Sequence, residues 1–235
     1  MASYAEALYR DRLLELVSPS TEWVELGCGR KLISTWMKNS EADQKYLSSR
    51  CKKLVGIDAM AEDVSSHPYL HEKVVGDLLQ LPFRDNSFNL SSARSVVEHI
   101  ADPALFLREV CRVLKPGGRF LFATPNYLYY QSFIASLTPN PLKKWLIGIL
   151  EGRAERDIFQ TYYRMNTPGK VANLLRGAGL EVESLETIEC PPEFTSLGRP
   201  IAGIEKTVTV SLRCSWLKSF RAVIVAVARK PKTIN

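Results

Sequence analysis

Short runs of apolar and β-branched residues recur along the chain and predict the strands of a sheet. Five of these runs come before residue 126, and two more follow a helical pattern that ends at residue 179. Each run is bounded by turn-forming or polar residues, as strands usually are. The predicted strands lie at 21–27, 52–58, 73–77, 89–95, 119–125, 181–189 and 222–230.

Helical patterns separate several of these strands. A short amphipathic helix is predicted over 4–17, and a second over 104–115, where apolar residues share one face before PGG ends the helix. A third is predicted over 167–179, with a Thr cap, a Pro in its first turn and a Gly stop. Strands that alternate with helices are typical of a mostly parallel sheet covered on both faces. The pattern therefore predicts an α/β fold with a seven-stranded sheet.

Two segments depart from this alternation. Residues 38–50 are largely polar, and we expect them to form a surface extension. Residues 126–165 form a connection much longer than the roughly 2–6 residues usual in α/β units. Within it, apolar residues of 142–150 recur at helical spacing, which predicts an amphipathic helix. We expect 126–165 to be a helical lid inserted into a single domain that spans 1–235.

The composition is that of an ordinary soluble globular protein. Hydrophobic residues make up 46% of the chain and charged residues 24%, and 31 Lys plus Arg against 25 Asp plus Glu give a net charge of +6. This mild excess permits an anionic ligand, a membrane surface or nucleic acid but requires none of them. The basic residues are scattered and no RNA-binding module is visible, so nucleic acid is not an expected partner.

The cysteine spacing and the N-terminal pattern indicate where in the cell the protein is expected. The five Cys are widely spread and include no C-x-x-C pair, which favours a reducing compartment over a disulfide framework or a zinc site. Charged residues interrupt the first apolar pattern, so no secretory signal is predicted. No run approaches the ~20 apolar residues of a membrane span. The predicted location is cytoplasmic.

Candidate chemistry lies where the predicted strands end. The first strand runs into a turn with Gly27 and Gly29, where backbone amides can approach a ligand. An acid at the end of the second strand, Asp58, can accept bonds from ribose hydroxyls, and Asp77 at the end of the third can accept one from an adenine amine. Taken singly, the glycine turn could be a βα turn without a ligand, and Asp58 could be a strand-end cap. Together they would line one crevice. A nicotinamide loop is disfavoured, because Leu32 replaces its third glycine.

A series of motifs then follows in a distinctive order: VELGCGRK, LVGIDAM, VVGDLLQLPFRDNSFN, LREVCRVLKPGG with TPN, and LLRGAGLEV. The series resembles that of class I S-adenosylmethionine-dependent methyltransferases of the small-molecule type, similar to those of ubiquinone and menaquinone biosynthesis and of natural products. The resemblance implies a Rossmann-like, doubly wound sheet with an antiparallel closing strand. It also implies S-adenosyl-L-methionine as cofactor and S-adenosyl-L-homocysteine as product.

The same resemblance assigns cofactor-binding residues to four strand ends. The first end would hold the methionine part, the second the ribose and the third the adenine, while the fourth would face the sulfonium. In that order, the residues are Glu25, Gly27, Cys28 and Gly29; Asp58, Ala59 and Met60; Asp77 and Leu78; and Ala93 and Arg94. The chain departs from the family at Lys31, where a third glycine is usual, and at Asn89, where Asp is common. A cation at Lys31 could itself help to bind the methionine carboxylate.

Glu98 and His99 are the candidate catalytic pair. A hydroxyl acceptor must lose a proton, and a neutral histidine can take it. The alternative is a structural pair, with His99 capping the next turn. In ubiquinone O-methyltransferases a similar pair has a further Glu three residues earlier that helps to hold a metal; this chain has Ser95 there, so no metal is predicted. His67 and His71 are expected to lie in a surface loop.

Two aromatic clusters bracket the long connection and are candidates for the acceptor pocket. They comprise Tyr127, Tyr129 and Tyr130, and then Tyr162, Tyr163 and Arg164; of the first cluster, Tyr127 and Tyr130 are the expected substrate-binding residues. Aromatic walls with phenolic tips suit a flat or glycosidic small molecule, although the same residues could simply anchor the connection. A third possibility concerns Lys143, Lys144 and Trp145, which could rest at a membrane surface; peripheral membrane contact is not favoured.

The expected function is methyl transfer to a small-molecule acceptor, at a hydroxyl oxygen of a secondary metabolite, sugar, phenol or quinol. The alternatives are N- or C-methylation of a small molecule, an RNA-modifying methyltransferase, and a non-catalytic adenosine-ligand binder. The expected assembly is a monomer or a homodimer.

Overall fold

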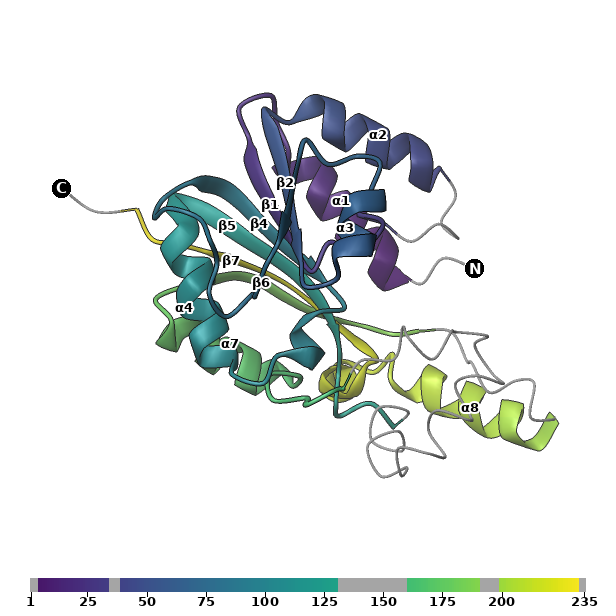
Figure 1. Ribbon diagram of the computed structural model, residues 1–235. Helices are drawn as coiled ribbons and strands as arrows, with labels where there is room; N and C mark the ends of the chain where they lie inside the picture. Colours follow the sequence, from purple (N-terminus) through teal and green to yellow (C-terminus); the bar gives the residue numbers. More distant parts are fainter. Residues whose placement is uncertain (1–3, 34–38, 131–159, 191–198, 233–235) are drawn as a thin grey trace.

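The computed structural model describes residues 4–33, 39–130, 160–190 and 199–232. Seven strands form a single sheet that runs through the middle of the molecule (Figure 1). The strands are β1 (Glu22–Leu26), β2 (Lys53–Asp58), β3 (Glu72–Val75), β4 (Phe88–Arg94), β5 (Leu114–Pro125), β6 (Glu181–Ile188) and β7 (Val223–Arg229). Each lies where the sequence predicts a strand.

The strand order is β3-β2-β1-β4-β5-β7-β6. All neighbouring pairs are parallel except those of β7, which runs antiparallel to both β5 and β6. The prediction of a doubly wound sheet with one antiparallel closing strand is therefore confirmed. The order reverses between β1 and β4, and open α/β sheets bind ligands beyond the carboxyl ends of the strands at such a point.

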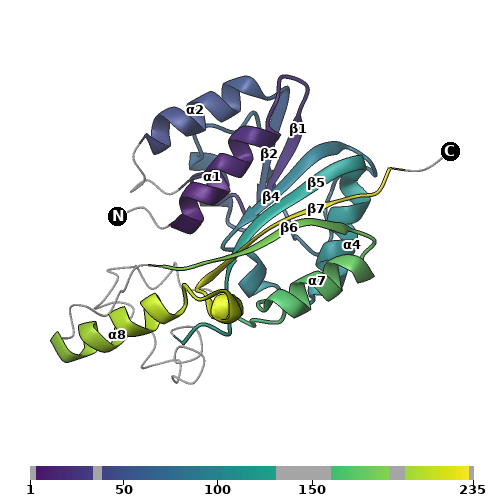
Figure 2. The same cartoon turned by 180° about the vertical axis from the view of Figure 1, so that it is seen from behind.

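Helices cover both faces of the sheet (Figure 2). One face carries α1 (Tyr4–Leu16) and α2 (Ser40–Arg50), and the other carries α4 (Pro103–Val113) and α7 (Pro168–Gly177). Both α4 and α7 begin with a proline in the first turn and a side-chain cap, which the sequence predicts for α7. The remaining elements are α3 (Ala61–Ser66), the 3₁₀ helices η1 (Val97–His99) and η4 (Ser215–Phe220), and α8 (Arg199–Ser211).

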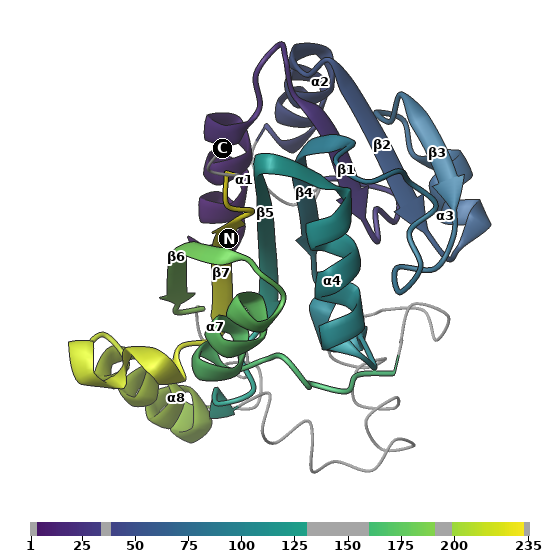
Figure 3. The same ribbon diagram turned by 90° about the vertical axis from the view of Figure 1, so that its left-hand side faces the viewer.

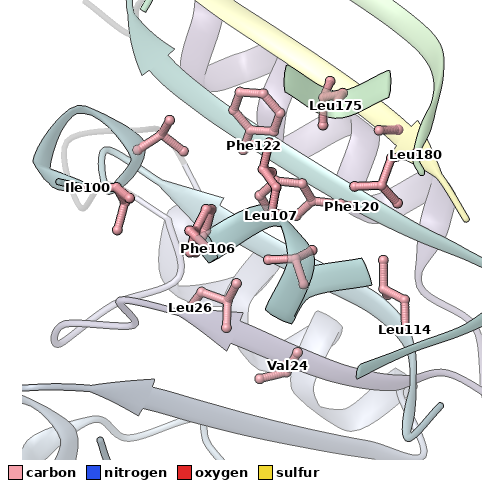
Figure 4. Packing of buried hydrophobic residues seen from close by; sticks show 14 of the residues in the cluster. Val24, Leu26, Ile100, Phe106, Leu107, Leu114, Phe120, Phe122, Leu175 and Leu180 are labelled. Atoms are coloured by element: carbon pink, nitrogen blue, oxygen red, sulfur yellow. The ribbon is translucent and has the colours of Figure 1, made fainter. Parts of the chain in front are cut away.

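Apolar side chains fill the space on both sides of the sheet. On the α4 and α7 side, Phe106 packs edge-on against Phe120, which stacks on Phe122 with ring centroids 4.9 Å apart (Figure 4). On the α1 and α2 side, Tyr9 and Trp23 are both fully buried. Full burial of one such side chain is worth about 1.5–3 kcal/mol. The two cores thus hold the strands in place. The candidate site depends on this, because its residues lie at the strand ends.

The expectation that 38–50 form a surface extension is wrong, because residues 40–50 form α2. The helix buries Leu47 together with the polar Gln44. The Gln44 side-chain carbonyl accepts hydrogen bonds from the backbone amides of Leu32 (2.9 Å) and Ile33 (3.3 Å). A polar residue on the buried face of α2 therefore holds the chain just beyond the glycine turn.

The expectation of a surface loop at His67 is also wrong. The His67 side chain is fully buried, and its Nδ1 accepts a hydrogen bond from the Tyr69 amide at 3.2 Å. Burial lowers the pKa of His67 to about 4, with Lys73 adding to the effect. His71 is exposed, as expected.

The pattern of the sequence did not predict α8 or η4. Both lie beyond the sheet edge at which β5 ends and β7 begins (Figure 3). The helix predicted over 142–150 lies outside the described residues, as does most of 126–165, with the possible membrane contact at Lys143, Lys144 and Trp145. No helix in the described ranges is both long and apolar enough to span a bilayer.

Candidate active site

A cavity of about 360 Å³ opens at the carboxyl ends of β1 and β4. This is the position at which the strand order reverses, and the volume lies within the roughly 300–1,000 Å³ of small-molecule pockets. Its lining contains five of the predicted cofactor residues and three further polar ones: Glu25, Gly27, Cys28, Gly29 and Arg94, with Arg30, Lys31 and Ser95.

The glycine turn after β1 needs both of its glycines. Gly27 has φ 62°, and a Cβ there would lie 2.4 Å from a methyl carbon of Val96. Gly29 has φ 49°, and apart from its own chain neighbours no atom of the described residues lies within 4 Å of the place that its Cβ would take. Positive φ favours glycine in both cases, and at Gly29 the missing side chain leaves the backbone open to a ligand.

Asp58 lies at the tip of β2 and is bound to that turn. Its Oδ2 accepts a hydrogen bond from the Gly29 amide at 2.9 Å, and its Oδ1 accepts one from the Met60 amide at 3.0 Å. Each carboxylate oxygen has two lone pairs, so each retains one for a ligand hydroxyl. The capping role and the ligand role of Asp58 are therefore compatible. Ala59 and Met60 are exposed beside it.

Asp77 follows β3 on the same sheet edge but does not line the cavity. The Gly76 amide bonds to the Asp58 carbonyl at 3.1 Å, which brings the two strand ends together. The exposed Asp77 accepts a hydrogen bond from the Leu79 amide at 2.8 Å, while Leu78 packs against the core. Ala93 is fully buried at the end of β4 and lies outside the lining.

Glu25 forms the buried acidic wall of the cavity and is 2% exposed. The Trp23 indole N–H donates to Ser92 Oγ at 2.5 Å, which leaves the Ser92 hydroxyl to donate to Glu25 Oε2. Burial raises the pKa of Glu25 to about 7, against the opposing effects of Ser92 and Arg94. A positively charged ligand group in the cavity would favour the ionised carboxylate.

Cations line the rest of the cavity. Arg94 pairs with Glu6 of α1 at 3.3 Å and donates to the Leu32 carbonyl at 3.4 Å. Arg30 pairs with Asp63 at 2.7 Å. Lys31 forms no ion pair within the described part of the chain. The cavity therefore presents both signs of charge together with backbone amides, which suits a ligand that carries both an ammonium and a carboxylate.

Glu98 and His99 lie in η1, four and five residues after Arg94, and outside the cavity lining. Glu98 is buried; its Oε2 accepts a hydrogen bond from Thr124 at 2.9 Å, and its Oε1 lies 4.0 Å from His99 Nε2. Burial raises the pKa of Glu98, with His99 opposing. His99 Nδ1 lies 2.9 Å from the Gln160 carbonyl, which can only accept. The neutral ring therefore carries its proton on Nδ1, and Nε2 is the atom able to take another.

The two aromatic clusters are only partly brought together. The Tyr127 and Tyr163 rings lie 5.6 Å apart, and the amides of Tyr162 and Tyr163 both donate to the Glu98 carbonyl, at 2.8 and 3.3 Å. Tyr130 instead packs against Tyr129, with the two rings tilted by 55°, and donates its hydroxyl to Glu205 of α8 at 2.6 Å. The Arg164 guanidinium lies over the Tyr162 ring, 5.5 Å from its centroid.

The structure also adds residues that the sequence did not indicate. Asn166 is fully buried and donates to Thr124 Oγ1 at 2.7 Å, which continues the network from Glu98. The first helix contributes Glu6 and Tyr9 close to the cavity wall. Among the described residues, no group of three His, Cys, Asp or Glu side chains is arranged as metal ligands would be.

Residues 24–122, from β1 to β5, match the family described as "Methyltransferase domain". This region, which is less than half of the chain, is similar to the methyltransferase domains of that family. S-adenosylmethionine is the cofactor of such a domain, and the site fits it chemically. The cavity offers a carboxylate and cations for the amino-acid part. Asp58 does not line the cavity, but it is bonded to Gly29, which does, and it offers an acid for the ribose. The open space at Gly29 would let this part of the cofactor approach the backbone.

Curated relatives include methyltransferases of different acceptors. A ubiquinone biosynthesis O-methyltransferase of Ralstonia nicotianae is 25% identical over 171 residues, which cover 72% of this chain and 66% of that protein. The norajmaline N-methyltransferase of Rauvolfia serpentina is 33% identical over 86 residues, covering 35% and 30%. The chain thus spans from about a third to two thirds of the length of these two relatives.

Solved structures support the fold. A chain of the complex between the Haloferax volcanii Trm112 methyltransferase activator and the putative methyltransferase superposes with a TM-score of 0.62. The match covers 99% of this chain and 91% of that one at 21% sequence identity. At such identity the methyltransferase domain shares the architecture of its neighbour, and the acceptor does not follow from it.

Proposed function

We propose that this protein transfers a methyl group from S-adenosylmethionine to a hydroxyl oxygen of a small-molecule acceptor. The observation that carries the choice of oxygen is the arrangement of His99. Its Nδ1–H is held by the Gln160 carbonyl at 2.9 Å, and its Nε2 faces the buried Glu98 carboxyl at 4.0 Å. This is the arrangement expected of a base that removes a proton from a hydroxyl.

We propose that the cavity residues and the neighbouring ends of β2 and β3 hold the cofactor in parts. Glu25 would bind the α-ammonium group, Lys31 the α-carboxylate, and Asp58 the ribose hydroxyls. Asp77, beside Asp58 on the neighbouring strand, would accept a hydrogen bond from the adenine amine. Bound S-adenosylmethionine supplies an activated methyl group on a sulfonium. The task of the protein is then mainly to align the acceptor and exclude water, which can contribute about 7–11 kcal/mol in favourable cases.

His99 is proposed to remove the acceptor proton and Glu98 to stabilise the resulting imidazolium. Glu98 is oriented for this by Thr124, and Thr124 by Asn166. Nearby, Tyr127 and Tyr163 offer two aromatic faces for a flat acceptor such as a phenol or quinol. Burial, followed by the charge of Glu98, raises the pKa of Tyr163, so its phenol stays a hydrogen-bond donor at neutral pH.

The test is formation of S-adenosylhomocysteine from S-adenosylmethionine with a panel of phenols, quinols, glycosides and amines. We expect turnover with at least one hydroxyl compound, and we expect the His99→Ala variant to lose it. Turnover with none of the hydroxyl compounds, together with turnover of an amine, would overturn the choice of oxygen.

N-methylation is the second candidate, and the norajmaline N-methyltransferase relative favours it. An amine that reaches the site without its extra proton needs no general base. The two candidates therefore differ in one measurable respect: under N-methylation, His99→Ala would retain most of the wild-type turnover.

A further inference from the structure

The first helix reaches the cofactor cavity through two side chains. Glu6 and Tyr9 lie on successive turns of α1. This helix packs on one face of the sheet, against side chains of β1, β5 and β7 (Figures 1 and 2). Neither residue belongs to the matched methyltransferase region at 24–122. Each nevertheless faces a charged residue that lines the cavity.

Glu6 holds Arg94. Their side chains are 17% and 22% exposed and pair at 3.3 Å, so the pair is partly shielded from water. The same guanidinium donates to the carbonyls of Leu32 at 3.4 Å and Lys31 at 3.5 Å. Arg94 thus links α1 to the segment that follows the glycine turn, and a change at Glu6 would be transmitted to the cavity wall.

Tyr9 faces Glu25. Its side chain is 1% exposed, and in the described structure its hydroxyl forms no hydrogen bond of normal geometry. Glu25 and Ser92 both lie close enough to influence its ionisation. Burial, followed by the charge of Glu25, raises the pKa of Tyr9, so the phenol stays protonated and can donate.

A donor at this place has a specific use. In the described structure the Ser92 hydroxyl donates to Glu25, and the Ser92 oxygen already accepts from Trp23. Tyr9 lies close enough to Glu25 to favour its ionised form. Ionisation of a buried carboxylate opposite a cationic ligand calls for further donors, and a buried phenol that lacks a well-formed hydrogen bond is itself destabilising. Both costs fall if Tyr9 turns its hydroxyl to Glu25 when the cavity is filled.

We propose that α1 is a working part of the cofactor site, with Tyr9 and Glu6 as positioning residues that act through Glu25 and Arg94 and couple the docking of α1 to cofactor binding. The proposal rests on the proposed cofactor-binding role of the cavity. It adds two binding-site residues from outside the matched region. It also implies that α1 packs more firmly on the sheet when the ligand is bound.

The test is titration calorimetry of the full chain with S-adenosylhomocysteine, which needs no acceptor. Tyr9→Phe removes only the hydroxyl and should weaken binding by about ten- to a hundredfold, since a hydrogen bond to a charged group is lost. Glu6→Gln should weaken it about three- to tenfold. The matched controls are Tyr46→Phe, on the exposed side of α2, and Glu15→Gln, whose partner Arg12 is also on α1. Both controls should bind as the wild type does.

Hydrogen exchange provides a second readout that does not depend on the variants. Addition of S-adenosylhomocysteine to the wild type should slow exchange of the α1 amides at least severalfold, and Tyr9→Phe should abolish most of that slowing. Wild-type affinity in both Tyr9→Phe and Glu6→Gln, with α1 exchange unchanged by ligand, would overturn the proposal. A wild-type chain that binds no S-adenosylhomocysteine would instead overturn the cofactor-binding role on which the proposal rests.

Discussion

The two ends of the candidate site are built differently. At the cofactor end, Asp58 accepts two backbone hydrogen bonds, and Arg94 bonds to a backbone carbonyl and to Glu6 of α1. Glu25 is buried and accepts a hydrogen bond from Ser92. At the acceptor end, Tyr127 and Tyr163 lie in connections that are tied to the core mainly through backbone bonds. A cofactor with fixed chemistry suits a site made of strand ends, whereas an acceptor that differs between relatives suits segments that can change without altering the sheet.

The largest effect should come from the acceptor end. His99→Ala should lower kcat for a hydroxyl acceptor by about 10²–10⁴-fold, because the proton of the acceptor loses its base. Affinity for S-adenosylhomocysteine should stay unchanged, because His99 does not line the cavity. Steady-state kinetics and calorimetry measure the two quantities separately. The control is His71→Ala, at an exposed histidine beside Ser48 of α2, which should change neither quantity. A joint loss of turnover and affinity would mean that the two ends are not independent.

The next effect concerns stability at the cofactor end. The raised pKa of Glu25, about 7 against an unfolded value near 4.5, means that the folded state holds this proton more tightly. Wild-type stability should therefore fall as pH rises from about 4.5 to 7, by up to about 3 kcal/mol. Glu25→Gln should remove this loss while impairing cofactor binding. Urea unfolding of both proteins at pH 5 and pH 8 measures the difference.

Glu22 on the same strand gives a control of opposite sign. Hydrogen bonds from Lys115 and Lys52 lower the pKa of Glu22 to about 2. Its contribution to stability is present above about pH 4.5 and is lost as pH falls through 2. Glu22→Gln should therefore be less stable than the wild type at pH 8. If Glu25→Gln were also less stable than the wild type at pH 8, burial would not be destabilising the ionised Glu25 carboxylate.

A smaller effect is expected from the network behind Glu98. Thr124→Val keeps the shape of the side chain but removes the hydroxyl that donates to Glu98 at 2.9 Å. We expect kcat to fall about three- to tenfold, since one hydrogen bond worth about 0.5–1.5 kcal/mol is lost and Glu98 is left less well oriented. The pH dependence of kcat should also shift, which a merely structural change would not cause. Thr207→Val, on the exposed face of α8, should change neither.

The sequence predicted the sheet well, because its strands are apolar runs that parallel β-structure buries on both faces. It also indicated the strand ends that we propose to hold the cofactor, because Asp58 ends one of those runs and Asp77 comes just after another. It missed α2 because that helix buries polar residues, Gln44 among them, and so has no apolar period to detect. It also missed α8, although that helix is amphipathic.

The partners across the site could not be predicted for a different reason. Arg94 and Glu6 are 88 residues apart in the sequence, and Asn166 and Thr124 are 42 residues apart. No spacing rule brings such pairs together; only the packing of helices on the completed sheet does. The acceptor end depends mostly on contacts of this kind, which is why its chemistry is less evident from the sequence than that of the cofactor end.

The most direct test of the central claim, that the cavity beyond β1 and β4 binds S-adenosylmethionine, is the affinity of Asp58 variants for S-adenosylhomocysteine. Asp58→Ala should weaken binding by roughly 10- to 100-fold, in line with the loss of hydrogen bonds between a carboxylate and a ribose. Asp58→Asn, which keeps one acceptor oxygen, should fall between Ala and the wild type. Asp85→Ala, at an exposed carboxylate paired with Arg112, should bind as the wild type does. Equal affinity in all four proteins would contradict the account.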